Sequence, residues 1–582
     1  MAAPAATYRL QFHGGFPFDA AIGILGYLSD LGVTHVYASP YLQAAPGSTH
    51  GYDVVDPTRV NGEIGGEEGF VRFAEALARH GLKQILDIVP NHMAITGPEN
   101  RWWADVLENG PSSQYASFFD VDWGKPEDRP SDRILLPILG DHYGRVLAAG
   151  DIRLARAEGR FHFAYHERRL PVAPRSLAPL LARAAATAPS ELLGFLSDAL
   201  DALPHPSATD RTSTRRRHRD KEIIQDQLSR LLAGTPEVAR AVDEQIERVN
   251  AQPDSLHEML EEQNYRLAHW RLASTDLGYR RFFDVSGLIG LRTEDEAVFQ
   301  ETHRRVLEWI REGRLDGLRI DHPDGLRDPE EYLRRLRDAA PDAWITVEKI
   351  LQPGEKLRRA WPVEGTTGYD ALNLINGLFV DPTGEEPLTW IYQDFTGERR
   401  AFADVALEKK RLVLDALLSS DLNRLTELGA RLCEDRRSYR DFSRRDLYDG
   451  IRELIAQLPV YRTYVRAEAG ILAEEDRRLL NETVDRARAA RPDLDAELFD
   501  LLQRVLRLEH RGPREAEFVM RFQQITGPAA AKGVEDTVLY AYNRLLSLNE
   551  VGGDPGRFGV TPEEFHRHMR EAAERWPRSL TA

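Results

Sequence analysis

The chain has 582 residues, of which 42% are hydrophobic and 29% charged, and its formal net charge is −17. This length predicts several domains, and the composition is that of a globular protein with a sizeable core. The negative charge argues against nucleic acid or another polyanion as a partner. We interpret the one basic run, Arg215–Arg219, as a solvated face.

A single cysteine, Cys433, excludes an internal disulfide framework and favours a reducing compartment. The first residues contain no apolar signal segment, and no stretch approaches about 18 uninterrupted apolar residues. We therefore expect a soluble, cytoplasmic protein.

The first 92 residues alternate strand and helix patterns. The predicted strands are Thr7–Phe12, Val33–Ala38 and Leu82–Val89. Between them we predict one helix that Asp19 caps and Gly32 ends, and a second over Glu67–His80. Strands and helices in this order form a parallel sheet or a barrel.

This alternation stops near residue 94. Residues 94–215 are rich in Pro, Trp and Gly, with short strand candidates at Ile134–Leu139 and Gly159–Tyr165, which is typical of a domain inserted in a loop. Gln225–Leu272 is predicted to be mostly helical.

The strand and helix pattern then returns. A helix is predicted over Val298–Arg314, a strand over Leu315–Ile320, a helix over Asp328–Ala340 and a strand over Trp344–Ile350. Residues 385–510 are charged and helical, which favours an inserted helical bundle, with a coiled coil or solenoid as the alternative. The last predicted barrel strand is Glu517–Ile525.

Two of these strands end in a carboxylate, Asp321 and Glu348. Parallel strands joined by a helix bring both groups to the C-terminal edge of one sheet, where a (β/α) barrel keeps its chemistry. One ionised and one protonated carboxyl group that face the same cleft are typical of enzymes that cleave or transfer glycosidic bonds. Arg319 precedes Asp321 by two residues and therefore lies on the same strand face, where its charge is expected to lower the pKa of Asp321.

Several motifs resemble a known family. Asp87–His92, Gly317–His322 and the strand that ends in Glu348 resemble the first three signature regions of the α-amylase superfamily, glycoside hydrolase family 13. Six further stretches resemble the maltooligosyltrehalose synthase family within it: Tyr8–His13, Ser48–Val54, Tyr279–Phe283, Gly365–Asp370, Gly527–Thr537 and Asn549–Pro555.

The resemblance implies an intramolecular transglucosylase. Such an enzyme converts the reducing-end α-1,4 linkage of maltooligosaccharides to α,α-1,1, with Asp321 as the catalytic nucleophile and Glu348 as the catalytic acid and base. In the same comparison His92 corresponds to a hydrogen-bond donor to the sugar, Tyr52 to an aromatic platform beneath it, and His322 to a group on the acceptor side. No cofactor is implied, and no metal-ligand cluster stands out in the sequence.

Each assignment has a structural alternative. Asp321 and Glu348 could belong to an ion-pair network and Arg319 to a barrel-interior ion pair. His92 could be a loop histidine, Tyr52 a core residue, and His322 a capping or packing residue. Lys532, Glu535 and Asp536 match the family motif without a role that we can derive.

The expected fold is α/β, a TIM-type (β/α)8 barrel that is incomplete in this chain, with an inserted B-type domain and a helical insertion. We assign 1–93 to the first part of the catalytic barrel and 94–224 to the irregular insertion. We assign 225–384 to a helical segment and the central strands, 385–510 to the helical domain, and 511–582 to a later strand and helix.

One departure from the family pattern concerns completeness. We count about six barrel strands where eight are needed, and two catalytic carboxylates where the family uses three. We therefore expect a second chain to supply the remaining strands and the third carboxylate; a self-sufficient short variant is the alternative. The competing functions are another family 13 α-glucan hydrolase and an inactive fragment that binds glucan or a partner.

Overall fold

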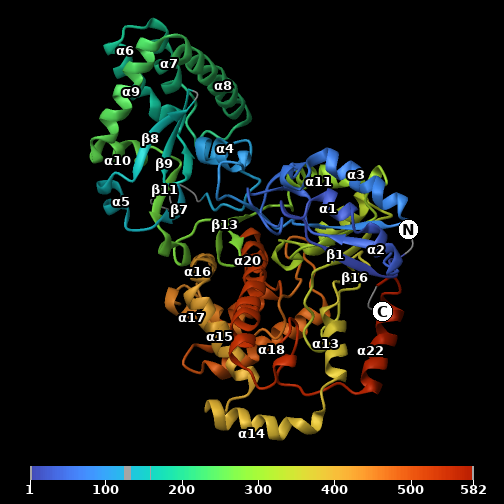
Figure 1. Cartoon of the computed structure of the whole chain (residues 1–582). Coiled ribbons are helices and arrows are strands. Elements are labelled where there is room, and N and C mark those ends of the chain that lie inside the picture. Colours follow the sequence, from blue (N-terminus) through green and yellow to red (C-terminus); the bar gives the residue numbers. More distant parts are fainter. Residues whose placement is uncertain (1–2, 124–132, 158, 580–582) are drawn as a thin grey trace. The chain divides into compact units, whose positions relative to one another are not determined.

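The structure is a computed structural model that describes residues 3–123, 133–157 and 159–579. The chain divides into two compact units (Figure 1). The first comprises Met1–His92, Phe282–Asp284 and Arg292–Ala582, and the second comprises Met93–Arg281 and Val285–Leu291. No helix within the described ranges combines the length and apolar composition that crossing a membrane requires.

The first unit is built on a six-stranded sheet with the order β1-β2-β5-β14-β15-β16, in which every neighbouring pair is parallel. Its strands are β1 (Thr7–Leu10), β2 (His35–Ala38), β5 (Lys83–Ile88), β14 (Gly317–Ile320), β15 (Trp344–Val347) and β16 (Gly365–Thr366). The prediction of an incomplete barrel sheet is therefore confirmed, and five of its six strands lie where the sequence placed them.

The sixth predicted strand is wrong. Glu517–Ile525 lies inside the helix α20 (Pro513–Ala530), and the sixth strand is the two-residue β16. The buried residues Phe518, Phe522 and Ile525 recur at steps of four and three positions, which is the spacing of a helix face rather than of a strand.

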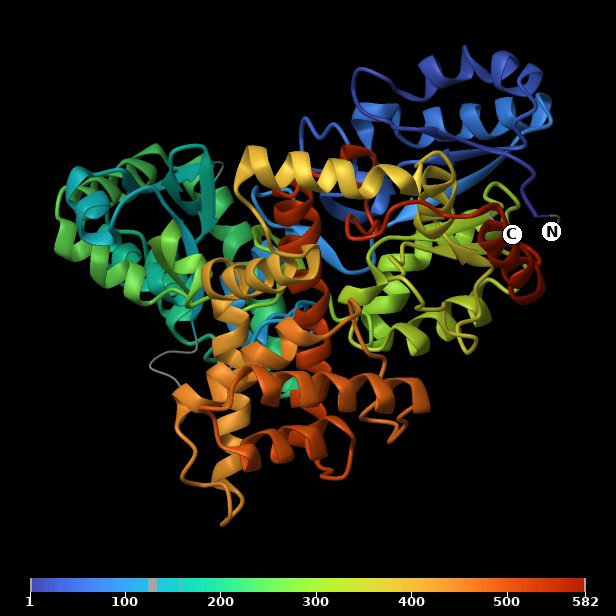
Figure 2. The same ribbon diagram turned by 90° about the horizontal axis from the view of Figure 1, so that it is seen from below.

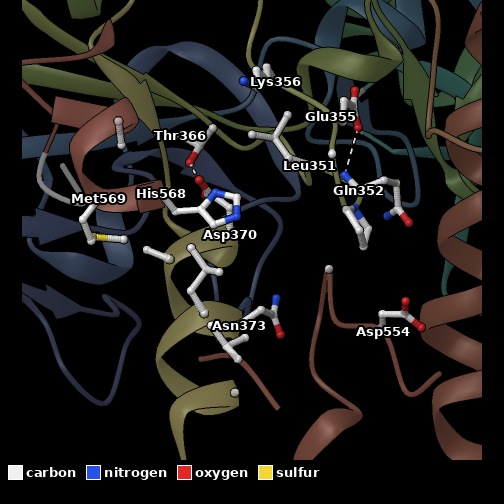
Figure 3. A pocket seen from close by; sticks show the side chains of 18 of the residues that line it. Leu351, Gln352, Glu355, Lys356, Thr366, Asp370, Asn373, Asp554, His568 and Met569 are labelled. Atoms are coloured by element: carbon white, nitrogen blue, oxygen red, sulfur yellow. Dashed lines mark hydrogen bonds between the residues drawn. The ribbon is translucent and has the colours of Figure 1, made fainter. Parts of the chain in front are cut away.

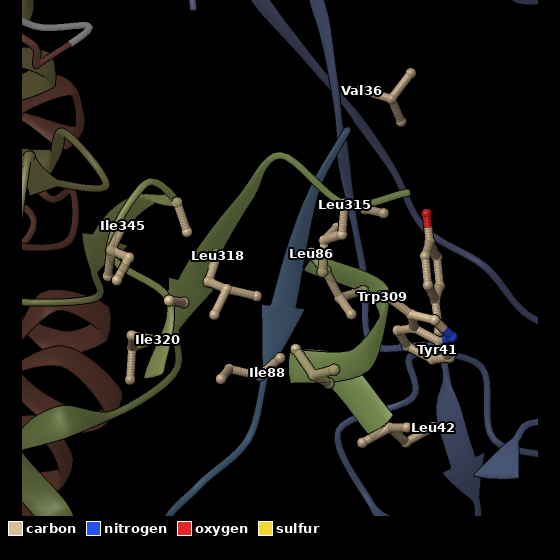
Figure 4. Packing of buried hydrophobic residues seen from close by; sticks show 14 of the residues in the cluster. Val36, Tyr41, Leu42, Leu86, Ile88, Trp309, Leu315, Leu318, Ile320 and Ile345 are labelled. Atoms are coloured by element: carbon tan, nitrogen blue, oxygen red, sulfur yellow. The ribbon is translucent and has the colours of Figure 1, made fainter. Parts of the chain in front are cut away.

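Helices cover this sheet and enclose an apolar core (Figure 4). They are α1 (Phe18–Ile22), α2 (Leu25–Asp30), α3 (Gly66–Arg79), α11 (Glu296–Arg311) and α12 (Pro329–Ala339). Trp309 is fully buried with its ring centroid 4.4 Å from that of Phe70, and it packs beside Tyr41 in the same apolar cluster as the strand residues Leu86 and Leu318. The single helix predicted between Asp19 and Gly32 is instead two short helices separated at Gly23 and Ile24, and glycine is a poor helix former.

The first unit also contains a β-hairpin and a large helical region (Figure 2). The hairpin pairs β3 (Leu42–Ala44) with β4 (Val54–Val60). The helices are α13 (Tyr369–Leu378), α14 (Glu385–Thr396), α15 (Phe402–Ala416), α16 (Ser419–Glu434), α17 (Arg444–Gln457), α18 (Glu474–Ala490), α19 (Ala496–Leu506), α20, α21 (Leu539–Ala541) and α22 (Pro562–Arg575). Residues of α15–α20 share one apolar core, as expected for a bundle.

The second unit contains more helix than predicted. Its strands are β7 (Ile134–Leu139), β8 (Ile152–Ala157), β9 (Arg160–Tyr165), β10 (Arg168–Pro171) and β11 (Tyr265–His269), and β6 (His92–Ala94), β12 (Arg281–Phe282) and β13 (Val285–Gly290) form a further sheet. Its helices are α4 (Arg101–Asn109), α5 (Tyr143–Ala149), α6 (Ala178–Thr187), α7 (Glu191–Asp201), α8 (Arg211–Gly234), α9 (Pro236–Asn250) and α10 (Pro253–Glu261). The unit continues to Arg281, whereas the sequence suggested an end at residue 224.

The basic run lies on α8 and is only partly a solvated face. Arg215, Arg216 and Arg219 are exposed, but Arg217 is fully buried. Arg217 donates hydrogen bonds to Asn109 Oδ1 at 3.0 Å and to the Pro204 carbonyl oxygen at 2.5 Å. This arginine therefore stabilises the fold of the second unit.

Candidate active site

A single guanidinium group, that of Arg319, connects three carboxylates at the C-terminal edge of the sheet. Arg319 lies opposite Asp87 in the register of β14 and β5. Its Nη1 donates to Asp87 Oδ1 at 2.9 Å and to Asp321 Oδ1 at 2.6 Å, and its Nη2 lies 3.6 Å from Glu348 Oε1. The two predicted catalytic carboxylates are therefore brought together at one arginine.

Backbone pairing fixes the positions of the two carboxylates. The amide of Asp321 donates to the Ile88 carbonyl oxygen at 3.0 Å, and the amide of Glu348 donates to the Ile320 carbonyl oxygen at 2.9 Å. Each acid thus continues the hydrogen-bond ladder one position beyond its strand. The Glu348 side chain retains 23% exposure and that of Asp321 retains 11%, so Glu348 is the more accessible of the two.

The electrostatic environment makes Glu348 the protonated member of the pair. Burial raises the pKa of Glu348, the negative charge of Asp321 raises it further, and Arg319 opposes both, leaving a pKa of about 8. Asp321 receives the close hydrogen bond from Arg319, whereas Glu348 lies 3.6 Å from the same guanidinium. At neutral pH the arrangement favours a protonated Glu348 beside an ionised Asp321.

The expected effect of Arg319 on Asp321 is only partly correct. Arg319 does favour the ionised carboxylate, but burial outweighs it and leaves the pKa of Asp321 raised rather than lowered. Three carboxylates share one guanidinium, and removing them from water disfavours their charged forms. Asp87 shows the same balance, with burial raising its pKa to about 6.

Tyr52 lies at the edge of this cluster and is partly buried. Its hydroxyl donates to Asp87 Oδ2 at 2.5 Å and accepts a hydrogen bond from Arg9 at 2.8 Å. Tyr37 also donates to Asp87 Oδ2, at 2.8 Å. Tyr52 is thus tied to the carboxylate cluster by its hydroxyl, and its predicted role as a platform for a sugar ring stays a prediction.

The two predicted histidines lie along an aromatic wall. The ring of His92 is 4.4 Å from that of Phe282, which meets the ring of His322 edge-on at 5.3 Å, and Phe283 meets His322 at 4.9 Å. His92 is buried, and His322 adopts the left-handed conformation with a φ of 45°. The backbone amide of His322 donates to Glu348 Oε2 at 2.8 Å.

Three residues near the pair had no assigned role in the sequence: Asp87, Tyr37 and Arg9. They occupy the same sheet face on three neighbouring strands, and Arg9 is opposite Tyr37 in the register of β1 and β2. Polar residues at corresponding positions of successive buried strands are the signal that would have found them.

The motif that includes Lys532 forms a further polar group in the first unit. It lies in an eight-residue π-helix, Ala531–Val538, a conformation that is rare and frequent at functional sites. Lys532 Nζ lies 3.1 Å from Asp284 and 2.8 Å from Asp536, and 5.5 Å from the ring centroid of Phe283. Glu535 accepts a hydrogen bond from Tyr461, and burial raises its pKa to about 7.

A separate pocket of roughly 260 Å³ lies beside α13 and α22 (Figure 3). Leu351, Asp370, Asn373, His568 and Met569 line it, and the Thr366 hydroxyl donates to Asp370 Oδ1 at 2.9 Å. None of the predicted site residues lines this pocket. In the part of the chain that the structure describes, no group of three or more His, Cys, Asp or Glu is arranged to hold a metal ion.

Comparisons with known proteins agree with the motifs and with this geometry. The model of the α-amylase catalytic domain matches residues 20–138. The putative maltooligosyl trehalose synthase of Mycobacterium tuberculosis (strain CDC 1551 / Oshkosh) is 36% identical over 99% of this chain and 62% of its own length. The structure of maltooligosyltrehalose synthase from Arthrobacter ramosus superposes with a TM-score of 0.75 at 36% identity, over 99% of this chain and 61% of that one.

Over nearly its whole length the chain is a homologue of maltooligosyl trehalose synthases. A maltooligosyl trehalose synthase of Sulfolobus tokodaii, named hypothetical, is more distant, with 31% identity and a TM-score of 0.68. This homologue spans about three fifths of the length of the relatives it matches. The half-barrel sheet, the additional sheets and the helical region are shared with the solved synthases.

In this synthase homologue, replacing Glu348 by Gln is expected to stabilise the fold at alkaline pH. The pKa of Glu348 is about 8 in the folded chain against an ordinary value of 4.5. At a pH between these two pKa values, Glu348 is ionised in the unfolded chain but keeps its proton in the folded chain. The stability that protonated Glu348 contributes is therefore fully present below the ordinary pKa and is lost as the pH rises through 8.

Glutamine cannot ionise, so E348Q should exceed the wild-type free energy of unfolding by several kcal/mol near pH 9 and by little near pH 4. Urea denaturation at the two pH values measures the difference. Glu68→Gln, on the exposed side of α3, is the control and should show no such dependence. Equal effects of E348Q at both pH values would contradict the raised pKa.

Proposed function

We propose that the chain carries the reaction centre of an intramolecular transglucosylase acting on maltooligosaccharides. The observation that supports this most is the placement of Asp321 and Glu348 at neighbouring strand ends around Arg319, where burial and the charge of Asp321 raise the pKa of Glu348. A nucleophile and an acid on adjacent strands are what a retaining double displacement needs. The homology to maltooligosyl trehalose synthases suggests an α-1,4-glucan as substrate.

In the first half of the reaction, an Asp321 carboxylate oxygen attacks the anomeric carbon of the penultimate glucose. The bond from that carbon to the leaving oxygen breaks, and Glu348 gives its proton to this oxygen. The products are a glycosyl ester on Asp321 and a free glucose, with Glu348 now ionised. Arg319 stays beside Asp321 throughout and stabilises its carboxylate before the ester forms and after it is released.

In the second half, the released glucose turns over and presents its O1. Glu348 takes the proton of that hydroxyl, O1 attacks the glycosyl carbon, and the ester to Asp321 breaks. Two displacements retain the α configuration and give an α,α-1,1 linkage. The glucose must stay bound and water must stay out during this interval. His322 follows Asp321 in the chain, donates its amide to Glu348 and packs against the rings of Phe282 and Phe283, which are suited to this task.

We further propose that turnover requires additional strands that close the sheet. Among the described residues β1 pairs only with β2, and β16 only with β15, so the parallel sheet has two open edges. A closed barrel has no open edge, and about two fifths of the relatives' own length lies outside the part that this chain matches. The polypeptide of that unmatched part would also supply the third catalytic carboxylate.

Adding this polypeptide is therefore expected to create or greatly increase turnover. The assay compares the chain alone with the chain plus a polypeptide equivalent to the unmatched part of the relatives, using maltopentaose. The expected product is a non-reducing, trehalose-capped oligosaccharide. Full turnover by the chain alone would contradict the requirement, and release of glucose or maltose instead would indicate an α-glucan hydrolase.

Replacing Asp321 by Asn in the completed protein is expected to lower formation of the non-reducing product by at least about a thousandfold, because asparagine cannot form the ester that the proposed mechanism assigns to Asp321. The matched control is Asp316→Asn, at the opposite end of the same strand, where the carboxylate accepts from the Gln84 amide. D316N should retain most of the activity. Retention of more than about a tenth of wild-type activity by D321N would refute the assignment.

A further inference from the structure

Lys349 directly follows Glu348 and is buried in a cluster that the mechanism above does not use. Its Nζ lies 3.2 Å from Asp324 Oδ2 and 3.2 Å from Glu355 Oε1, and it donates to the Ile350 carbonyl oxygen at 3.0 Å. The Lys349 side chain is 1% exposed. A lysine this deeply buried is destabilising unless it is paired, so its two carboxylates hold it in one position.

Asp324 belongs to the loop that contacts the acid. This loop follows β14, and its residue His322 donates its backbone amide to Glu348 Oε2 at 2.8 Å. Lys349 contacts the same loop two residues further on. Glu348 is therefore connected to this loop at two points. Its neighbour in the chain, Lys349, forms an ion pair with Asp324, and its own side chain accepts the hydrogen bond from the His322 amide.

The loop needs such support because its backbone is strained. His322 has a φ of 45°, a left-handed conformation that costs a non-glycine residue about 1 kcal/mol or more. The loop is also tightly packed: a Cβ added to Gly325 would lie 2.4 Å from His322 Cδ2 and 2.6 Å from Asn91 Oδ1. The amide of His322 therefore reaches Glu348 only while the surroundings hold this conformation.

The helical region of the first unit holds the loop from its other side. Tyr464 donates its hydroxyl to Asp324 Oδ1 at 2.5 Å, and Arg462 donates to the Asp324 carbonyl oxygen at 2.6 Å. Gln524 of α20 donates to the Gly325 carbonyl oxygen at 3.0 Å. Asp324 is consequently held by Lys349 on one carboxylate oxygen and by Tyr464 on the other.

We propose that Lys349 is a positioning residue. Through its ion pair with Asp324 it holds the loop that contains His322, so that the backbone amide of His322 keeps its hydrogen bond to Glu348. This role rests on the proposed function only in that Glu348 is the acid. It assigns a function to the helical region, which would support the acid through Tyr464 and Arg462. It also gives a reason for a buried lysine next to a catalytic glutamate.

The proposal can be tested by the sign of a pKa change. The groups that face Glu348 are Asp321, Arg319, Asp87, Tyr369 and the amide of His322. A hydrogen bond to an ionised carboxylate lowers its pKa, so loss of the His322 contact raises the pKa of Glu348. Asp324→Asn releases the loop but also removes a negative charge, which by charge alone would lower that pKa. The two effects have opposite signs.

The experiment is a pH titration of the chain labelled with [δ-13C]glutamate, with the Glu348 resonance assigned by its loss in E348Q. Lys349→Met and D324N are each expected to raise the pKa of Glu348 by about half a unit or more. The matched control is Lys221→Met, because Lys221 of the second unit is equally buried and is paired with Glu108 and Asp105. K221M should leave the pKa of Glu348 unchanged.

Asparagine has nearly the same shape as aspartate, and D324N leaves Lys349 paired with Glu355. If K349M does not fold, the pKa of Glu348 in D324N therefore decides whether the loop positions Glu348. A lowered or unchanged pKa of Glu348 in folded D324N would overturn the proposal. The titration needs no substrate and no turnover. A chain without transglucosylase activity would therefore still give an answer, and the two proposals can fail separately.

Discussion

The sharing of one guanidinium by three carboxylates determines the chemistry of this site. Asp87, Asp321 and Glu348 come from three neighbouring strands and converge on Arg319. One positive charge cannot compensate three buried negative charges, so the cluster favours retention of a proton. The proton goes to Glu348, which lies farthest from the guanidinium and has a pKa of about 8. A protonated carboxyl group and an ionised one side by side follow from this imbalance.

The parallel sheet makes this convergence possible. Its register places Arg319 opposite Asp87, and the hydrogen-bond ladder continues through the amides of Asp321 and Glu348. Around this centre, buried polar groups fix the carboxylates individually. Tyr37 and Tyr52 hold Asp87, and the His322 amide holds Glu348. The cost of burying so many charges is offset by hydrogen bonds whose geometry the scaffold determines before substrate arrives.

Much of this centre could be predicted from the sequence because it depends on local patterns. Asp321 and Glu348 each end a short apolar strand, and Arg319 shares the face of Asp321 by simple alternation. The place of Asp87 in the same cluster depends on which strands are neighbours and in what register, which no single segment encodes. The contact between Lys349 and Asp324 likewise joins two loops. The direction in which the pKa of Asp321 is shifted could not be predicted, because it depends on how deeply the whole cluster is buried.

The errors in the predicted fold have similar causes. Glu517–Ile525 is apolar enough to suggest a strand, and only its packing as part of the longer α20 shows the helical period. The true sixth strand, β16, has two residues and leaves almost no signal. In the second unit, α6 and α7 lie among prolines and glycines that suggested irregular structure. Tertiary context decided each of these cases.

The central claim is that Asp321 forms the covalent bond to the sugar. It is tested most directly by incubating the completed protein with a 5-fluoro-α-glucosyl fluoride and locating the label by mass spectrometry of peptides. The fluorine atom slows both displacements, while the fluoride leaving group needs no proton, so the ester should accumulate. The account predicts a label on Asp321 that is absent from D321N. A label on Glu348, Asp87 or any other carboxylate would contradict it.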